Sequence, residues 1–223
     1  MIIPAMKLTI KEVEPRIYHI GFSNQRDLWQ SMMRLQEYYE GKSELLRGNY
    51  FTFEELMHVF TNENGEFLNA DICYGFNIPG AVVIKWFDLF STQSGGLTIK
   101  ETQTFVALFQ KLTNSSEPWY LIATAKSNSK LIIKHEIAHG RFSINESYKD
   151  ACLNLISEIE HSDMLRISLA MTAMYNVDVV NDEIQAYLST ETNVALRLWF
   201  GVLHKNTQNV VKKLKRLYKE YKG

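Results

Sequence analysis

Residues 131–140 contain the sequence His-Glu-Ile-Ala-His, in which two histidines and a glutamate have the spacing HExxH. If this segment is an α-helix, His135 and His139 lie about one turn apart on one face, so both imidazoles can bind the same metal ion. Glu136 then lies on the adjoining face, where its carboxylate can polarise a metal-bound water without binding the metal. The spacing therefore predicts metal-assisted hydrolysis. The alternative is a helix surface that carries two ordinary histidines.

A hydrolytic zinc site needs three protein ligands and an open fourth position, so a third ligand must come from elsewhere in the chain. The metzincin arrangement is excluded, because Phe142 and Asn145 stand where it requires a glycine and a third histidine. Glu183, in a later segment with a helical pattern, is the candidate that we favour, although a glutamate there also suits the N-terminal end of a helix dipole. The rival third ligands, which otherwise read as solvated side chains, are Glu158, Glu160 and His161.

The sequence His135-Glu136-Ile-Ala-His139, followed by Glu183-Ile-Gln-Ala186-Tyr187, resembles the gluzincin class of zinc metallopeptidases. The resemblance covers about residues 119–190, and it implies that Zn²⁺ is bound by His135, His139 and Glu183. It also implies that Glu136 acts as a general base and then as a general acid. On this resemblance the protein is a zinc-dependent, metallopeptidase-like hydrolase of a peptide or protein substrate, in which a metal-bound water activated by Glu136 attacks a peptide carbonyl.

Residues 119–125 form a β-rich run before the HExxH segment. They resemble the edge strand with which gluzincins bind extended peptide. This resemblance implies that Leu121, Ala123 and Ala125 border the substrate.

The negative charge that develops on the attacked carbonyl needs a hydrogen-bond donor. Tyr187, one turn after Glu183, is the candidate that we assign to catalysis, although it could instead bond a ligand imidazole. The alternatives are Tyr148 and His161. Gluzincins often carry an aspartate four residues after the third ligand to orient a histidine, and here that position is Tyr187. Asp182 could substitute for the missing aspartate.

Two stretches in the N-terminal half, Met33-Arg34-Leu-Gln36-Glu37-Tyr-Tyr39 and Gly75-Phe-Asn-Ile-Pro79, resemble an HExxH family met in phage and viral genomes. This resemblance implies no substrate. If the protein is encoded by a phage, we expect it in the host cytoplasm.

Hydrophobic periodicity and helix-capping residues predict an α+β protein that is predominantly helical. Residues 1–117 read as a small mixed α/β lobe with a short sheet, and residues 118–223 as a zincin-like part with the strand, the HExxH helix and the C-terminal helices. We expect the two to form one compact unit. Capping boxes at Thr52 and Thr98 begin two predicted helices, and residues 74–80 read as a loop. The other predicted elements are strands over 6–12 and 15–21, and helices over 24–40, 82–90, 145–161, 163–175, 178–189, 194–204 and 206–221.

The chain has 223 residues, of which 46% are hydrophobic, so it can bury a sizeable core. Its formal net charge of −1 favours neither a nucleic acid nor a membrane surface as a partner. Cys73 and Cys152 are too few for a disulfide framework and suit a reducing compartment. The sequence shows neither a signal-peptide pattern nor an apolar run of about 18 residues, so we expect a cytoplasmic protein with no membrane partner.

The C-terminal segment interleaves basic and apolar residues, which predicts an amphipathic basic helix. We expect this helix to pack against the protein with its lysines in solvent. The alternative is a nucleic-acid partner bound through Lys212, Lys213, Lys215, Arg216 and Lys219. A further alternative for the whole protein is a non-catalytic binding protein that a metal stabilises. The sequence leaves the oligomeric state open.

Overall fold

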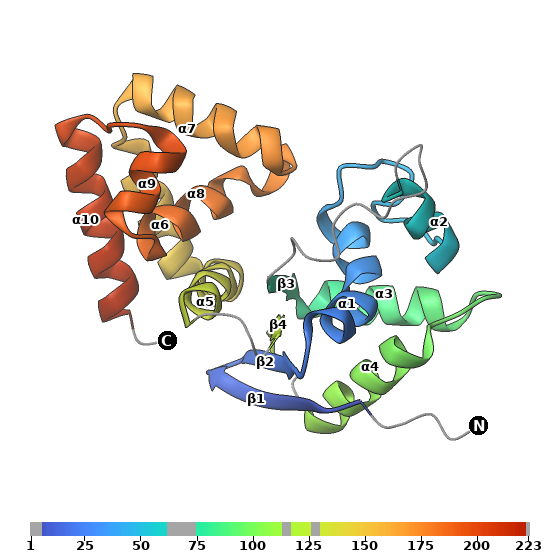
Figure 1. The fold of residues 1–223 in the computed structure, drawn as a ribbon. Helices are drawn as coiled ribbons and strands as arrows, with labels where there is room; N and C mark the ends of the chain where they lie inside the picture. Colours follow the sequence, from blue (N-terminus) through green and yellow to red (C-terminus); the bar gives the residue numbers. More distant parts are fainter. Residues whose placement is uncertain (1–5, 62–74, 113–116, 126–129, 222–223) are drawn as a thin grey trace. The chain divides into compact units, whose positions relative to one another are not determined.

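A computed structural model of the chain describes residues 6–61, 75–112, 117–125 and 130–221 (Figure 1). Within these ranges the chain forms ten α-helices, one short 3₁₀ helix and four strands, so the expected α+β class with predominant helix is confirmed. The chain divides into two compact units, Met1–Ile132 and Ile133–Gly223, which we call the N-terminal unit and the C-terminal unit.

The N-terminal unit contains a sheet of four strands in the order β1-β2-β4-β3. The strands are β1 (Leu8–Glu14), β2 (Ile17–Phe22), β3 (Gly75–Pro79) and β4 (Tyr120–Ala125). β4 runs parallel to β2 on one side and antiparallel to β3 on the other. It is therefore an interior strand of the sheet.

The prediction that residues 119–125 form an edge strand is wrong. Leu121, Ala123 and Ala125 lie in a strand that pairs with a neighbour on both sides, and their side chains are buried in the core of the unit. An added peptide strand needs unpaired backbone groups along an exposed edge, and β4 offers none. These three residues therefore cannot hold a substrate in the expected way.

The structure also differs from the sequence-based predictions of a loop over residues 74–80 and of a boundary after residue 117. β3 occupies most of the segment that was expected to be a loop, because its Phe76 and Ile78 side chains are buried in the core. The boundary expected after residue 117 lies instead between Ile132 and Ile133, because β4 belongs to the sheet of the N-terminal unit. Cys73 lies outside the described residues.

Helix α1 packs against β2, β3 and β4 and also contacts two further helices of the N-terminal unit, α3 and α4. The capping boxes predicted at Thr52 and Thr98 are both present, at the starts of α2 and α4. The helices of this unit are α1 (Gln25–Glu40), α2 (Phe53–Val59), α3 (Gly80–Ser91) and α4 (Ile99–Lys111).

A buried ion pair joins α1 to α4. The side chains of Arg34 and Glu101 are each 1% exposed, and the guanidinium donates from Nε to Glu101 Oε1 over 2.8 Å and from Nη2 to the other carboxylate oxygen. Nη1 also donates to the Phe51 carbonyl and Nη2 to the Gly96 carbonyl. The desolvated charges are thus paired and hydrogen-bonded, which is the condition for a buried ion pair to be tolerated.

The C-terminal unit is helical and is organised around α8, which contacts α6, α7 and α10 (Figure 1). Val180, Ile184 and Leu188 form one buried apolar row along α8, as residues four apart do on a helix. The helices here, of which α5 begins just before the boundary, are α5 (Lys130–Ile144), α6 (Glu146–Ser157), α7 (His161–Met174), α8 (Val180–Thr190), α9 (Asn193–Phe200) and α10 (Lys205–Glu220), with a 3₁₀ turn η1 (Val177–Val179) before α8. None of the helices in the described ranges is long and apolar enough to cross a membrane.

Replacing Glu101 by glutamine should lower the free energy of unfolding of the N-terminal unit by about 3–5 kcal/mol, because the buried guanidinium of Arg34 loses its counter-charge. Urea denaturation followed by tryptophan fluorescence measures this. The control is Lys100→Ala, which breaks the partly exposed pair with Asp27 and should cost about 1 kcal/mol or less. Equal losses in the two variants would contradict the assigned role of the buried pair.

Burial raises the pKa of the Glu37 carboxyl group on α1 from its ordinary value of 4.5 to about 7. The folded protein therefore binds more protons than the unfolded chain between these values, and the free energy of unfolding falls as the pH rises through this interval. We expect Glu37→Gln to remove most of this dependence and to be more stable than the wild type at about pH 8. Urea denaturation near pH 5 and near pH 8 tests this, and parallel losses in both proteins would contradict it.

Candidate metal centre

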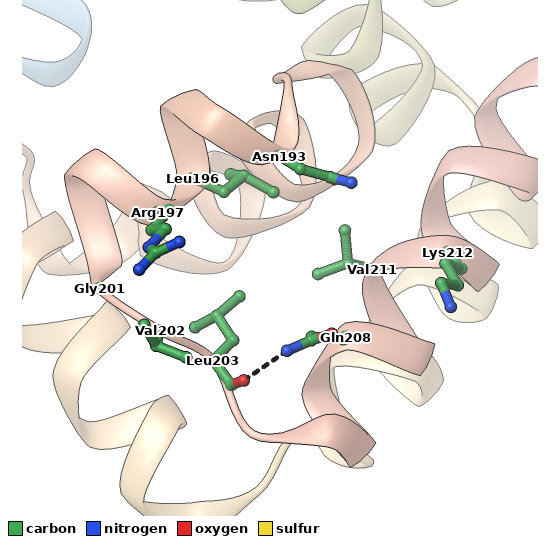
Figure 2. Close-up of a pocket in the computed structure, with 9 residues that line it drawn as sticks. All are labelled: Asn193, Leu196, Arg197, Gly201, Val202, Leu203, Gln208, Val211 and Lys212. Carbon is green, nitrogen blue, oxygen red and sulfur yellow. Dashed lines mark hydrogen bonds between the residues drawn. The ribbon is translucent and has the colours of Figure 1, made fainter.

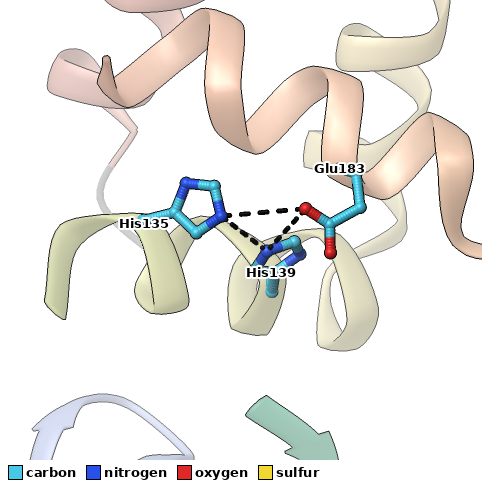
Figure 3. A group of neighbouring side chains, drawn as sticks. All are labelled: His135, His139 and Glu183. Carbon is cyan, nitrogen blue, oxygen red and sulfur yellow. Dashed lines mark hydrogen bonds and ion pairs between the residues drawn. The ribbon is translucent and has the colours of Figure 1, made fainter. Parts of the chain in front are cut away.

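Three side chains of the C-terminal unit converge on one point (Figure 3). His135 and His139 project from α5, and their Nε2 atoms lie 3.2 Å apart. The Oε2 atom of Glu183, in the first turn of α8, lies 3.8 Å from each of these nitrogens. Among the described residues, these three are the group of histidine, cysteine and acidic side chains whose ligand atoms lie close enough together to hold a metal ion.

The spacing of the three atoms fits a zinc ion. Two nitrogens bound tetrahedrally at about 2.0–2.1 Å from Zn²⁺ lie about 3.3–3.4 Å apart. The observed separation of His135 Nε2 and His139 Nε2 is 3.2 Å, close to this value. The 3.8 Å distances to Glu183 correspond to a wider angle at the metal, which a small movement of the carboxylate would close. Imidazole and carboxylate are also the donor types that zinc accepts at hydrolytic sites.

The carboxylate of Asp182 lies behind His139. Its Oδ1 atom is 2.9 Å from His139 Nδ1. A negative oxygen at this distance favours a hydrogen on Nδ1 of the neutral ring, and the lone pair of Nε2 then faces Glu183. This is the position that was expected for Asp182 behind a ligand histidine.

Thr190 has the same effect on His135, and its role was not expected from the sequence. Its hydroxyl donates its single hydrogen to the Ala186 carbonyl over 2.6 Å, and its oxygen lies 3.4 Å from His135 Nδ1. The hydroxyl can therefore only accept from that nitrogen, which places the hydrogen of His135 on Nδ1. Thr190 follows Glu183 by two helical turns on the same face of α8, and this spacing is the signal that could have identified it.

When both imidazoles are neutral, three lone pairs consequently face one another with no donor between them. The Oε2 atom of Glu183 is buried and has no hydrogen-bond donor among the described residues. Burial lowers the pKa of His139, but the carboxylates of Asp182, Glu183 and Glu136 raise it by more, so the net pKa lies well above the ordinary 6.5. The arrangement thus favours a positive charge at this point, and a divalent cation satisfies all three lone pairs at once.

A second layer of buried polar groups holds Asp182 in place. Gln185 Nε2 donates to Asp182 Oδ1 over 2.9 Å, and the Tyr148 hydroxyl lies 3.4 Å from Gln185 Oε1, to which it donates. Tyr148 is thus engaged behind the triad, so it is not placed to serve as the donor to a reacting carbonyl. Gln185 was not singled out from the sequence, because only the packing of α6 on α8 brings Tyr148 to it.

Tyr187 lies beside the triad. Its ring packs edge-to-face against the ring of His135, with centroids 4.7 Å apart, and its hydroxyl lies 2.9 Å from that of Tyr175. Burial raises the pKa of both tyrosines, and the charges of Glu183 and Glu136 raise it further. Both hydroxyls therefore stay protonated near neutral pH. Because one donates to the other, the pair keeps one hydroxyl hydrogen for an outside acceptor. Tyr175, directly after α7, was not singled out, because its separation from Tyr187 in the sequence has no helical regularity.

Glu136 is buried, with 6% of its surface exposed, and its charge acts on His139, Tyr175 and Tyr187. It follows His135 directly on α5, so it lies beside the ligand face and not on it. Glu136 is therefore not one of the three converging side chains.

The rival third ligands are occupied elsewhere. Glu158 pairs with Lys213 over 2.6 Å on the surface, and Glu160 caps α7 by accepting from the backbone of Ser162 and Asp163. His161 is exposed at the start of α7. None of the three belongs to the convergent group.

The basic C-terminal helix is α10, and it packs through Val210, Val211 and Leu214. Lys213 pairs with Glu158, and Lys215 donates to Asn193 Oδ1 over 2.9 Å. The remaining basic residues named above, Lys212, Arg216 and Lys219, are exposed.

No protein family, curated protein or solved structure matches the chain.

Removing the Thr190 hydroxyl should weaken zinc binding. We expect Thr190→Val, which keeps the shape of the side chain, to lower the zinc affinity by about 10–100-fold, because the His135 ring loses the acceptor that fixes its tautomer. Competition with a chromophoric zinc chelator measures this affinity. The matched control is Thr190→Ser, which keeps the hydroxyl and should bind zinc nearly as tightly as the wild type. A valine variant with wild-type affinity would contradict the role of the hydroxyl.

Proposed function

We propose that the chain is a zinc-dependent hydrolase of the metallopeptidase type, acting on a peptide or protein substrate. The observation that carries the proposal is the convergence of His135, His139 and Glu183 on one point with three lone pairs and no donor. A fourth group, Glu136, stands beside that point without belonging to the triad.

Each residue has a distinct task in the proposed reaction. When bound, Zn²⁺ would supply a Lewis acid and lower the pKa of a water at the open position. Glu136 takes the proton of the attacking water and later delivers it to the leaving amine. The Tyr187–Tyr175 pair keeps one hydroxyl hydrogen, which is a donor available to the negative charge that develops on the attacked carbonyl oxygen. Asp182 and Thr190 hold the two imidazoles with Nε2 directed inward.

A second candidate is a metal-stabilised binding protein without turnover. It is favoured by the burial of the centre, since the side chains of His139 and Glu183 are only 2% and 3% exposed. The two candidates differ in what Glu136 does. In a structural site its carboxylate transfers no proton, and the wild-type protein hydrolyses nothing.

We also propose a reducing compartment, the cytoplasm or the host cytoplasm if the protein is encoded by a phage. The support is Cys152, a buried free thiol packed inside the C-terminal unit.

The test combines metal content with turnover in the purified full chain. Mass spectrometry of the metals should find stoichiometric zinc in the wild type and in Glu136→Gln, and little zinc in His139→Ala and Glu183→Ala. A mixed peptide library read by mass spectrometry should be cleaved by the wild type and about 10²–10⁴-fold more slowly by Glu136→Gln.

The matched control is Glu146→Gln, the same chemical change at an exposed residue of α6, which should keep both zinc and activity. Wild-type protein without zinc would contradict the metal site. Zinc-loaded wild-type protein that cleaves nothing, or that cleaves no faster than Glu136→Gln, would contradict the hydrolase and leave the structural metal site.

A further inference from the structure

A pocket of about 280 Å³ lies between α9 and α10 in the C-terminal unit (Figure 2). Leu196, Leu203 and Val211 are directed into it and supply the apolar part of its lining, while Asn193, Gln208, Arg197 and Lys212 supply the polar part. An apolar lining with a few polar groups at fixed places is typical of a binding site. The pocket therefore suits a group that is apolar in part and negatively charged in part.

The charges at the borders are available to a partner. Both Arg197 and Lys212 are exposed, and neither makes an ion pair within the part of the chain that the structure describes. A third cation, Lys215, is fixed beside the pocket by its 2.9 Å bond to Asn193 Oδ1. The electrostatic complement of this border is a carboxylate.

Large apolar side chains continue outward from the pocket. Val194 and Leu198, four residues apart on α9, are 71% and 81% exposed, and Val202, just beyond the helix, is 63% exposed. These residues flank Arg197, so a single apolar surface with a cation in it runs along the outer side of α9. Contiguous exposed apolar residues of this kind mark interaction sites.

The same helix reaches the candidate metal centre. Trp199 on α9 packs against the ring of Tyr187 with centroids 5.5 Å apart, and Tyr187 in turn packs against His135. α9 thus contributes residues to the pocket and also packs against a residue that contacts the candidate metal centre.

We propose that the pocket and the outer side of α9 bind a segment of a polypeptide substrate that carries acidic and large apolar side chains. Its carboxylates pair with Arg197 and Lys212, and its apolar side chains enter the pocket and cover Val194 and Leu198. That the partner is a substrate rests on the proposed function, whereas its chemistry rests on this surface alone.

A polypeptide fits this surface better than the other anionic partners. A small molecule held in about 280 Å³ would leave Val194 and Leu198 uncovered. A nucleic acid would need aromatic rings on which bases stack, together with a basic groove, and none of the residues that line the pocket is aromatic.

The experiment selects ligands from a displayed random-peptide library on the full-length Glu136→Gln protein. We expect the enriched peptides to combine Asp or Glu with Leu, Ile or Phe. Fluorescence anisotropy with an enriched peptide should show affinity falling at least about ten-fold in Arg197→Glu and in Lys212→Glu. The matched control is Lys219→Glu, the same charge change on α10 outside the pocket, which should leave the affinity within about two-fold.

Several results would overturn the docking surface. These are enriched peptides without acidic residues, affinity unchanged by Arg197→Glu, no enriched peptide at all, and displacement of the peptide by single-stranded DNA. A monomer–dimer equilibrium abolished by Leu198→Glu would assign the surface to a second copy of the chain instead.

The outcome is separable from that of the proposed function. Peptide binding that persists after the metal is chelated, in a protein that cleaves nothing, supports the docking surface while the hydrolase fails. Cleavage of short peptides that is lost in Glu136→Gln, together with no docking, supports the hydrolase and overturns the surface.

Discussion

Three hydrogen-bond acceptors that face one another without a donor are the constraint around which the C-terminal unit is built. The lone pairs of His135, His139 and Glu183 repel unless a cation lies between them, and two of the three side chains are almost completely buried. The packing of the unit maintains this unfavourable arrangement. α8 is held by α6, α7 and α10, and Asp182 and Thr190 on α8 turn the two imidazoles inward. A helix with a purely structural role would not need three hydrogen-bond acceptors directed at one another.

The local parts of the centre could be predicted from the sequence, because a helix converts spacing into position. The separation of His135 and His139 placed both rings on one face of α5, and Asp182 and Glu183 fell within the helix predicted over residues 178–189. The other partners depend on which helices pack together. Thr190 and Tyr175 acquire their roles only when α8 meets α5 and the end of α7, and no spacing in the sequence encodes that meeting.

In the sheet, too, local structure could be predicted from the sequence and the packing of distant segments could not. Residues 120–125 form a strand, as their composition predicts, but its place in the sheet depends on partners distant in the sequence. β3 was expected to be a loop, and its pairing with β4 makes an edge strand into an interior one. A substrate therefore cannot bind by adding a strand to β4. The surface of α9, with Arg197 and Leu198 exposed and Trp199 against Tyr187, offers a different way to hold a polypeptide near the centre.

The central claim is that these side chains form a three-ligand zinc site with one open position. X-ray absorption at the zinc edge, on the full chain loaded with one equivalent of zinc, tests it most directly. The claim predicts nitrogen and oxygen ligands at about 2.0–2.1 Å, the outer-shell scattering of two imidazoles, and a further light-atom ligand that an added small inhibitor such as a hydroxamate replaces. A sulfur ligand at about 2.3 Å, scattering without imidazole, or a coordination shell that such an inhibitor leaves unchanged would contradict it.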